Sequence, residues 1–199
     1  MIKIALGTSN PHKLEEINEM LNSFREEFSD KIQFVLVEGE FNPVENGTTF
    51  AENSYIKAFE AAKIMGIPAL ADDTGLCVDA LDGRPGLHSA RYAPDQKSKI
   101  EKLLQEMNGV DLGKRSAHFE CTMTLVSPEG NVLNSSVGVI NGEIAKSPSG
   151  NHGFGYDPLF FIPELNKTMA EMTLEEKNTL SHRARALMPM IEWIVQNYS

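Results

Sequence analysis

The sequence predicts an α/β fold, with a mixed central sheet and flanking helices, and three observations carry this prediction. Apolar residues are concentrated in short strand-like segments at 2–7, 32–37 and 67–71. Segments with the 3.6-residue period of helices lie between them, as in strand–helix–strand units. Residues 116–145 contain further strand-like segments separated by turn signals, which is typical of an antiparallel meander. We expect a single domain over residues 1–199, because no linker or repeat interrupts this pattern.

Capping signals set the bounds of the expected helices. Asn10 has the character of an N-cap and Pro11 that of a first helical residue, and the apolar spacing continues to about Phe28. Thr49 and the glutamate three residues later have the spacing of a capping box, so a second helix begins there and ends before Gly66. Further helices are expected at about 95–108 and from near Ser181 onward.

Turn signals divide the strands. The apolar run 67–71 predicts a short strand that ends at Asp72. In the meander, "SPEG" predicts one turn and Asn141-Gly142 a second, because an Asn-Gly pair is a strong hairpin signal. A glycine-rich loop at 150–158 precedes a strand in "LFFI".

Charge and cysteine content restrict the function. The chain has a formal net charge of −10, which argues against a nucleic-acid or anionic-membrane partner, because those partners require a basic face. The two cysteines are too few for a disulfide framework and indicate a reducing compartment. The N-terminal segment lacks the features of a signal peptide, so we expect a cytoplasmic protein.

The segment "TSNPHK", residues 8–13, joins the first strand to the start of a helix. Free backbone N–H groups and the helix dipole favour an anion at such a place. Thr8, Ser9 and Asn10 add side-chain donors, and Lys13 adds a positive charge one turn into the helix. A plain helix cap with a solvated lysine explains the same residues, and this segment alone slightly favours that interpretation.

The segment "LADDTG" places Asp72 and Asp73 at the carboxyl end of the third strand, where ligands bind in open α/β sheets. Neighbouring side chains of an extended chain point to opposite sides, so we do not expect the two carboxylates to share one site. One of them can face a ligand while the other accepts backbone hydrogen bonds. A polar Asp-Thr-Gly turn is an equally good interpretation of this segment by itself.

Three further segments offer polar groups. Glu45 could ligate a divalent metal and Lys57 could reach a phosphate, although this segment alone favours plain surface charge. In "GNHGFGYDP", residues 150–158, Phe154 could stack on a base and Asp157 could hydrogen-bond its edge; the competing interpretation is a tight turn with buried aromatic residues. Lys177, His182 and Arg183 cluster near the start of the last helix, where they either read oxygen atoms of a ligand or are solvated. Together these groups fit phosphoryl chemistry on a nucleotide with a divalent metal.

Five segments, taken in order, resemble the inosine triphosphate pyrophosphatase family (XTP/dITP diphosphatases). They are "TSNPHK", "TFAENSYIKA", "ADDTGLCVDALDGRPGLHSARYA", "GFGYDPLF" and "EKNTLSHRARAL", and they run from residue 8 to about residue 187. The resemblance implies hydrolysis of aberrant purine nucleoside triphosphates (ITP, dITP, XTP) to the monophosphate and pyrophosphate. It also implies a Mg²⁺ requirement, a homodimer, and an elongated two-lobed domain with a cleft between the lobes.

The resemblance also implies roles for single residues. Asp73 matches the catalytic carboxylate, which also serves the metal, and Glu45 matches an acidic metal position. We therefore expect Asp73→Asn to be nearly inactive and Asp72→Asn to be impaired less. Ser9 stands where glycine is common, and Thr74 stands where serine is common. The positions implied to contact substrate are Thr8, Ser9, Asn10, Pro11, His12, Lys13, Lys57, Thr74, Phe154, Gly155, Tyr156, Asp157, Lys177, His182 and Arg183.

Two other functions compete with this one. A related pyrophosphatase acting on pyrimidine or modified triphosphates would share most of the motifs. A nucleotide-binding protein without catalysis would bind ITP and not turn it over. The donor groups of Lys177 and Arg183 favour a base with an oxygen at C6 over adenine, which has an amino group there.

Overall fold

The structure is a computed structural model that describes residues 1–24 and 26–198. Its strands form one seven-stranded sheet in the order β2-β1-β3-β4-β5-β6-β7. β1 pairs in parallel with β2 and β3, whereas β6 pairs antiparallel with β5 and β7. The predicted α/β class with a mixed sheet is confirmed. The strands are β1 Ile2–Leu6, β2 Ile32–Leu36, β3 Ala69–Val78, β4 Ser116–Val126, β5 Val132–Ile144, β6 Phe160–Ile162 and β7 Lys167–Thr168.

The helices follow most of the predicted capping signals. Thr49 caps α3, where its side chain accepts a hydrogen bond from the Glu52 N–H, and Gly66 ends this helix in a left-handed conformation. Ser181 caps α6 in the same way through the Ala184 N–H. The α-helices are α1 Pro11–Phe24, α2 Glu26–Ser29, α3 Phe50–Met65, α4 Gln96–Glu106, α5 Leu174–Leu180 and α6 His182–Asn197, and 3-10 turns lie at Asp79–Leu81, Gly86–Arg91, Leu112–Lys114, Pro163–Leu165 and Met169–Glu171.

The chain divides into two compact units. Unit 1 comprises Met1–Asp73, Cys121–Gly138 and Asn178–Ser199, and unit 2 comprises Thr74–Glu120 and Val139–Lys177. Neither unit is continuous in sequence, because the divisions fall within β3, β4, β5 and α5.

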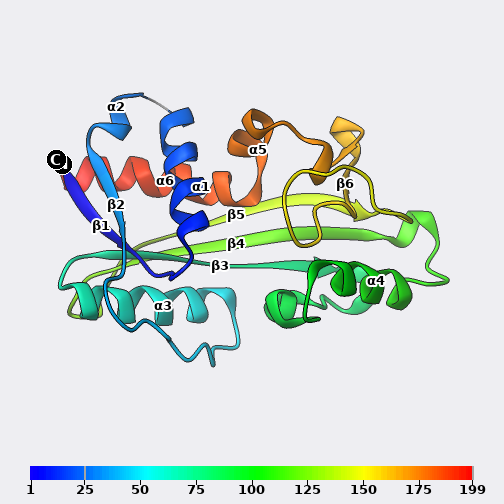
Figure 1. Ribbon diagram of the computed structural model, residues 1–199, viewed down its shortest axis with the longest axis horizontal. Helices are drawn as coiled ribbons and strands as arrows, with labels where there is room; N and C mark the ends of the chain where they lie inside the picture. Colours follow the sequence, from blue (N-terminus) through cyan, green and yellow to red (C-terminus); the bar gives the residue numbers. More distant parts are fainter. Residues whose placement is uncertain (25, 199) are drawn as a thin grey trace. The chain divides into compact units, whose positions relative to one another are not determined.

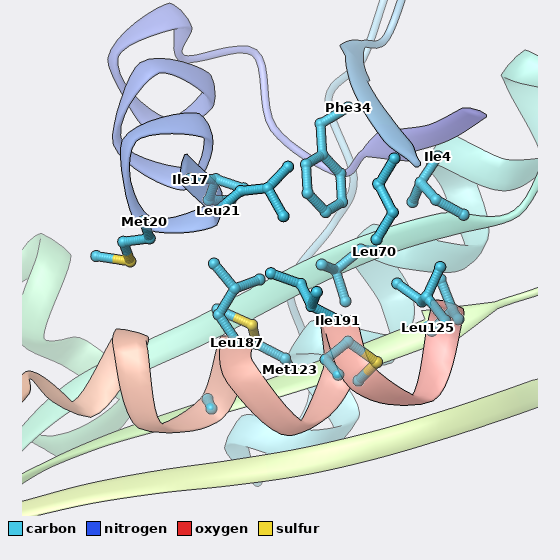
Figure 2. Packing of buried hydrophobic residues seen from close by; sticks show 14 of the residues in the cluster. Ile4, Ile17, Met20, Leu21, Phe34, Leu70, Met123, Leu125, Leu187 and Ile191 are labelled. Atoms are coloured by element: carbon cyan, nitrogen blue, oxygen red, sulfur yellow. The ribbon is translucent and has the colours of Figure 1, made fainter. Parts of the chain in front are cut away.

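The core of unit 1 has two different faces. On one face, large apolar side chains of the sheet pack against α1 and α6, including Ile4, Phe34 and Leu70 (Figure 2). On the other face, small residues such as Ala5 and Ala69 lie against α3. This helix lies on the side of the strands opposite α1 and α6 (Figure 1). Residues of β3 alternate between the two faces, as the two-residue period of a strand requires.

The expected end of the third strand at Asp72 is wrong. β3 continues for ten residues from Ala69 to Val78, so "DDTG" is strand and not a polar turn. The strand that ends here is β1, because Leu6, its last residue, pairs with Leu70. Asp72 and Asp73 therefore lie just beyond the carboxyl end of β1, where an open α/β sheet places its ligands.

The turn expected at Asn141-Gly142 is also wrong, because both residues lie inside β5. A Cβ atom at Gly142 would lie 2.5 Å from the Phe161 carbonyl oxygen and 2.7 Å from the Phe160 ring. This glycine therefore serves the close approach of β6 and not the conformation of a turn. The hairpin at "SPEG" is confirmed, since Gly130 N–H donates to the Ser127 carbonyl and Ser127 N–H to the Asn131 carbonyl.

The first expected helix, Pro11 to about Phe28, corresponds to α1 and α2; residue 25, between them, lies outside the described residues. The third corresponds to α4, which Asp95 caps. Helix α5 carries Lys177 and was not predicted, because it has only seven residues and no clear apolar period. Within residues 1–24 and 26–198, every helix is too short or too polar to span a bilayer.

Candidate active site

Asp72 lies on the α1 and α6 side of unit 1, among cations. Its Oδ1 atom is 2.6 Å from Lys13 Nζ and its Oδ2 atom is 3.4 Å from Arg183 Nη2. The side chain is only 6% exposed. Burial by itself would raise the pKa of Asp72, but the charges of Lys13, Arg183 and Lys57 outweigh burial and hold this pKa well below its usual range. Asp72 is therefore a permanently ionised structural carboxylate.

Asp73 lies on the α3 side and is held by two residues of that helix. Lys57 Nζ is 2.7 Å from Asp73 Oδ1, and Asn53 Nδ2 is 3.4 Å from Asp73 Oδ2. Burial raises the pKa of Asp73; Lys57 opposes this shift and the charge of Glu45 adds to it. A carboxylate with a raised pKa is suited to accept a proton. The two neighbouring aspartates thus have opposite electrostatic environments, as strand alternation requires.

Lys57 connects Asp73 with Glu45. Its ammonium nitrogen lies 3.0 Å from Glu45 Oε2 as well as 2.7 Å from Asp73 Oδ1. Burial by itself would lower the pKa of Lys57, but the carboxylates of Asp73 and Asp72 outweigh it and raise this pKa. The cationic form of Lys57 is therefore fixed, and two carboxylates meet at one positive charge.

The carboxylates of Glu45 and Asp73 fit a Mg²⁺ ion. Both groups provide hard oxygen ligands, and both lie within 3.0 Å of the same ammonium group. The described residues contain no group of three or more His, Cys, Asp or Glu side chains with metal-binding geometry. Mg²⁺ commonly takes one or two protein carboxylates and completes its shell with water and substrate phosphates. A pair of acidic residues is therefore sufficient for a metal that takes its remaining ligands from water and a bound anion.

The segment "TSNPHK" forms the start of α1 in unit 1. Asn10 Oδ1 accepts the His12 N–H at 3.1 Å, and Thr8 Oγ1 accepts the Asn10 N–H at 3.1 Å. Ser9, Asn10, Pro11 and His12 are exposed. Lys13 extends from the first turn to Asp72, so the lysine is not simply solvated. The segment combines the dipole of a helix start with a fixed ammonium group, which favours an anion.

Unit 2 contains a separate group on the glycine-rich loop. Asp157 Oδ2 accepts the Phe154 N–H at 3.0 Å and lies 2.5 Å from Lys177 Nζ. Phe154 is 58% exposed, and Lys177 Nζ lies 5.5 Å from the centre of the Phe154 ring. The exposed aromatic ring can stack on a base, and the ammonium group held beside it can donate a hydrogen bond to that base.

The other predicted residues lie in varied surroundings. Tyr156 is buried, and its hydroxyl donates to the Ser89 carbonyl at 3.0 Å. Gly155 has a φ of 62° in the same loop, and Thr74 follows on β3 within unit 2. His182 is the buried first residue of α6. Arg183 is neither solvated nor exposed, since it is 5% exposed and contacts Glu16 and Asp72.

Two residues of the site were not predicted from the sequence. Glu16 Oε1 lies 2.8 Å from Arg183 Nη1 and joins it to α1. Asn53 holds Asp73 from α3. Helical spacing was the available signal, because Glu16 lies three residues after Lys13 and Asn53 lies four residues before Lys57, each on the same helix face.

Comparison with known proteins gives a consistent result. The family model described as the Ham1 family matches residues 4–193 of this chain. A dITP/XTP pyrophosphatase of Geobacter sulfurreducens is 47% identical over 195 residues, covering 94% of each chain, and one of Synechocystis sp. is 43% identical over 194 residues, covering 97% of this chain and 96% of the relative. A solved structure of a HAM1 protein from Coxiella burnetii has a TM-score of 0.85 at 38% identity, covering 98% of this chain and 100% of that one.

Proposed function

The chain belongs to the Ham1 family, and we propose that it is a nucleoside triphosphate pyrophosphatase that hydrolyses ITP, dITP and XTP to the monophosphate and pyrophosphate. The observation that carries this proposal is the match along almost the whole chain to proteins named dITP/XTP pyrophosphatases. Such an activity removes aberrant purine nucleotides from the nucleotide pool. The matched range also supports one pyrophosphatase domain over residues 1–199.

The residues of unit 1 are assigned to the triphosphate. Lys13, Lys57 and the positive end of the α1 dipole bind phosphate oxygens, with Thr8, Ser9, Asn10, Pro11 and His12 forming the turn. Mg²⁺ held by Asp73 and Glu45 would neutralise charge on the triphosphate and on the departing pyrophosphate. Asp73 orients the water that attacks the α-phosphorus and accepts its proton, for which its raised pKa is suitable. Catalysis of this kind rests mainly on positioning and electrostatics.

The residues of unit 2 are assigned to the base. Phe154 stacks on the purine ring, with Gly155, Tyr156 and Thr74 shaping the surroundings. Asp157 holds Lys177 at 2.5 Å, and this ammonium group donates to the oxygen at C6 of hypoxanthine or xanthine. Lysine has no acceptor atom, so the amino group of adenine would face a donor. Sites of this kind reject the mismatched analogue by about 10⁴-fold.

His182 and Arg183 complete the proposed substrate contacts from unit 1. The buried Nε–H of Arg183 has no hydrogen-bond partner among the described residues, so this donor is available to a substrate oxygen. The other contacts of the guanidinium group to Glu16 and Asp72 fix its orientation. We also propose that the protein requires Mg²⁺ and works as a homodimer in the cytoplasm, on the basis of the family resemblance.

The test is turnover of ITP, dITP and XTP with and without Mg²⁺, with ATP and GTP in parallel. Phosphate should be detected only after inorganic pyrophosphatase is added, because the product is pyrophosphate. Asp73→Asn should abolish this signal while leaving the fold intact. Binding of ITP without turnover would instead indicate a nucleotide-binding protein, and equal turnover of ATP and ITP would refute the assignment of Lys177 to the base.

A further inference from the structure

We infer that Asn53 is a positioning residue that fixes Asp73 and the Glu45-bearing loop relative to each other. The inference rests on the proposed function, since it concerns the two carboxylates assigned to the metal. Asn53 is 3% exposed and lies in the first turn of α3. A buried primary amide must use its donors and its acceptor, because an unsatisfied polar group in the interior costs about 1–3 kcal/mol.

The two ends of the Asn53 side chain bind two different segments. Its Oδ1 atom accepts the backbone N–H of Gly47 at 2.9 Å, two residues after Glu45. Its Nδ2 atom donates to Asp73 Oδ2 at 3.4 Å. The Gly47 N–H can only donate and an ionised Asp73 can only accept, so the opposite orientation of the amide would lose both hydrogen bonds. The side chain is therefore a bridge of fixed direction between the loop and β3.

The position of Asn53 is itself held within α3. Its backbone N–H donates to the Thr49 carbonyl at 3.1 Å, within the first turn of α3. The next residue, Ser54, shares a 2.6 Å hydrogen bond with Thr124 of β4, which adds to the general stability of α3 on the sheet and does not involve the Asn53 side chain. Lys57, one helical turn later, binds the other oxygen of Asp73. The two oxygens of the Asp73 carboxylate are thus each held by α3, which prevents rotation of this group.

The loop approaches α3 so closely at Gly47 that no side chain fits there. A Cβ atom at Gly47 would lie 2.7 Å from Asn53 Oδ1 and 2.7 Å from Glu52 Cβ. A side chain at this position would therefore push the loop away from Asn53, and Glu45 would move with it. Residues that hold metal ligands by hydrogen bonds typically change metal affinity or activity by 10- to 100-fold when mutated.

The test compares three variants with a control. In Asn53→Ala, amide hydrogen exchange at 43–48 of the free protein should be about tenfold faster, because the Gly47 N–H loses its acceptor. The Mg²⁺ concentration for half-maximal dITP turnover should rise by about 10- to 100-fold. Gly47→Ala should raise this Mg²⁺ concentration in the same way. Asn53→Asp keeps an acceptor for the Gly47 N–H and loses the donor to Asp73, so exchange should stay at the wild-type rate while kcat falls by at least about tenfold.

Ser54→Ala is the matched control, because it removes a buried hydrogen bond from the same helix without touching Gly47 or Asp73. It should lower stability and leave the Mg²⁺ requirement within about twofold of wild type. If Ser54→Ala raised the Mg²⁺ concentration for half-maximal turnover as much as Asn53→Ala does, Asn53 would act through general stability. This result would overturn the inference. Unchanged exchange and an unchanged Mg²⁺ requirement in Asn53→Ala would overturn it as well.

Failure of the proposed function would give a different result. A wild-type protein that does not hydrolyse dITP refutes the function, and the exchange measurements on the free protein still decide whether Asn53 holds the loop. If Glu45→Ala leaves the Mg²⁺ requirement unchanged, the metal role of Glu45 is wrong. If Glu45→Ala raises it and Asn53→Ala does not, the inference about Asn53 is wrong and the metal site stands.

Discussion

The same substitution at two neighbouring residues should have very different effects on stability. In Asp72→Asn, a neutral amide replaces the carboxylate between Lys13 and Arg183, and its NH₂ group is a further donor among donors. Removing one partner of a buried ion pair costs about 3–5 kcal/mol. In Asp73→Asn, the neutral group replaces a carboxylate whose ionised form is disfavoured by burial and by Glu45. The unfolding free energy of Asp73→Asn should therefore lie within about 1 kcal/mol of wild type.

Urea denaturation at pH 7 measures this difference. With a slope of about 2 kcal/mol per M, a loss of 4 kcal/mol moves the midpoint by about 2 M. Asp72→Asn should lower the midpoint by about that amount, and Asp73→Asn should leave it nearly unchanged while abolishing turnover. If Asp72→Asn is too unstable to purify, Lys13→Met provides the same test from the other side of the ion pair. A larger loss of stability in Asp73→Asn than in Asp72→Asn would refute the assignment.

The pH dependence of stability should separate the two residues again. The pKa of Asp72 is lowered in the folded state, so its contribution is complete above the unfolded pKa of about 4 and is lost as the pH falls below it. The difference in unfolding free energy between wild type and Asp72→Asn should therefore shrink between about pH 5 and pH 2. Asp73 has the opposite shift, so its ionisation lowers stability as the pH rises through about 4. Denaturation midpoints across this range measure both effects.

Three further predictions concern other parts of the chain. Gly138→Ala should fail to fold or lose more than about 3 kcal/mol, because its Cβ would lie 2.0 Å from the His182 carbonyl oxygen, and expression with circular dichroism tests this. Arg115→Met should lower the thermal midpoint by about 4–8 °C, because the buried guanidinium group binds four backbone carbonyls. Lys177→Met should reduce kcat/KM for dITP by at least about tenfold and should not lower kcat/KM for dATP, whose amino group no longer faces a donor, whereas equal losses would contradict a role in base selection.

The sequence was sufficient wherever a local signal determined the structure. The caps Thr49, Gly66 and Ser181 mark α3 and α6 because capping depends on the groups within one helical turn. The two Asp side chains were correctly expected to diverge, since strand geometry alone requires it. Hairpin turn "SPEG" follows from the same kind of local chemistry.

Non-local contacts set the features that were missed. Asn141-Gly142 carries a turn signal, but the approach of β6 decides that this segment is strand. β3 continues through two charged residues because cations from α1, α3 and α6 meet them on both faces, and these cations are distant in sequence. The contact between Glu16 and Arg183 spans 167 positions of the chain, so the helical spacing that places Glu16 beside Lys13 could not identify Arg183 as its partner.

Because side chains of β3 alternate between the two faces of the sheet, a change in the number of residues before Asp72 should harm the site more than a substitution there. Deleting one residue from the segment 69–71 would send each aspartate to the opposite face of the sheet. Asp73 would then enter the cage of Lys13 and Arg183, and the residue after it, Thr74, would stand opposite Lys57 and Asn53. Asp72 would point to the α3 side from the place that Ala71 now holds, so no carboxylate would remain opposite Lys57 and Asn53, although every side chain needed for catalysis would still be present in the protein.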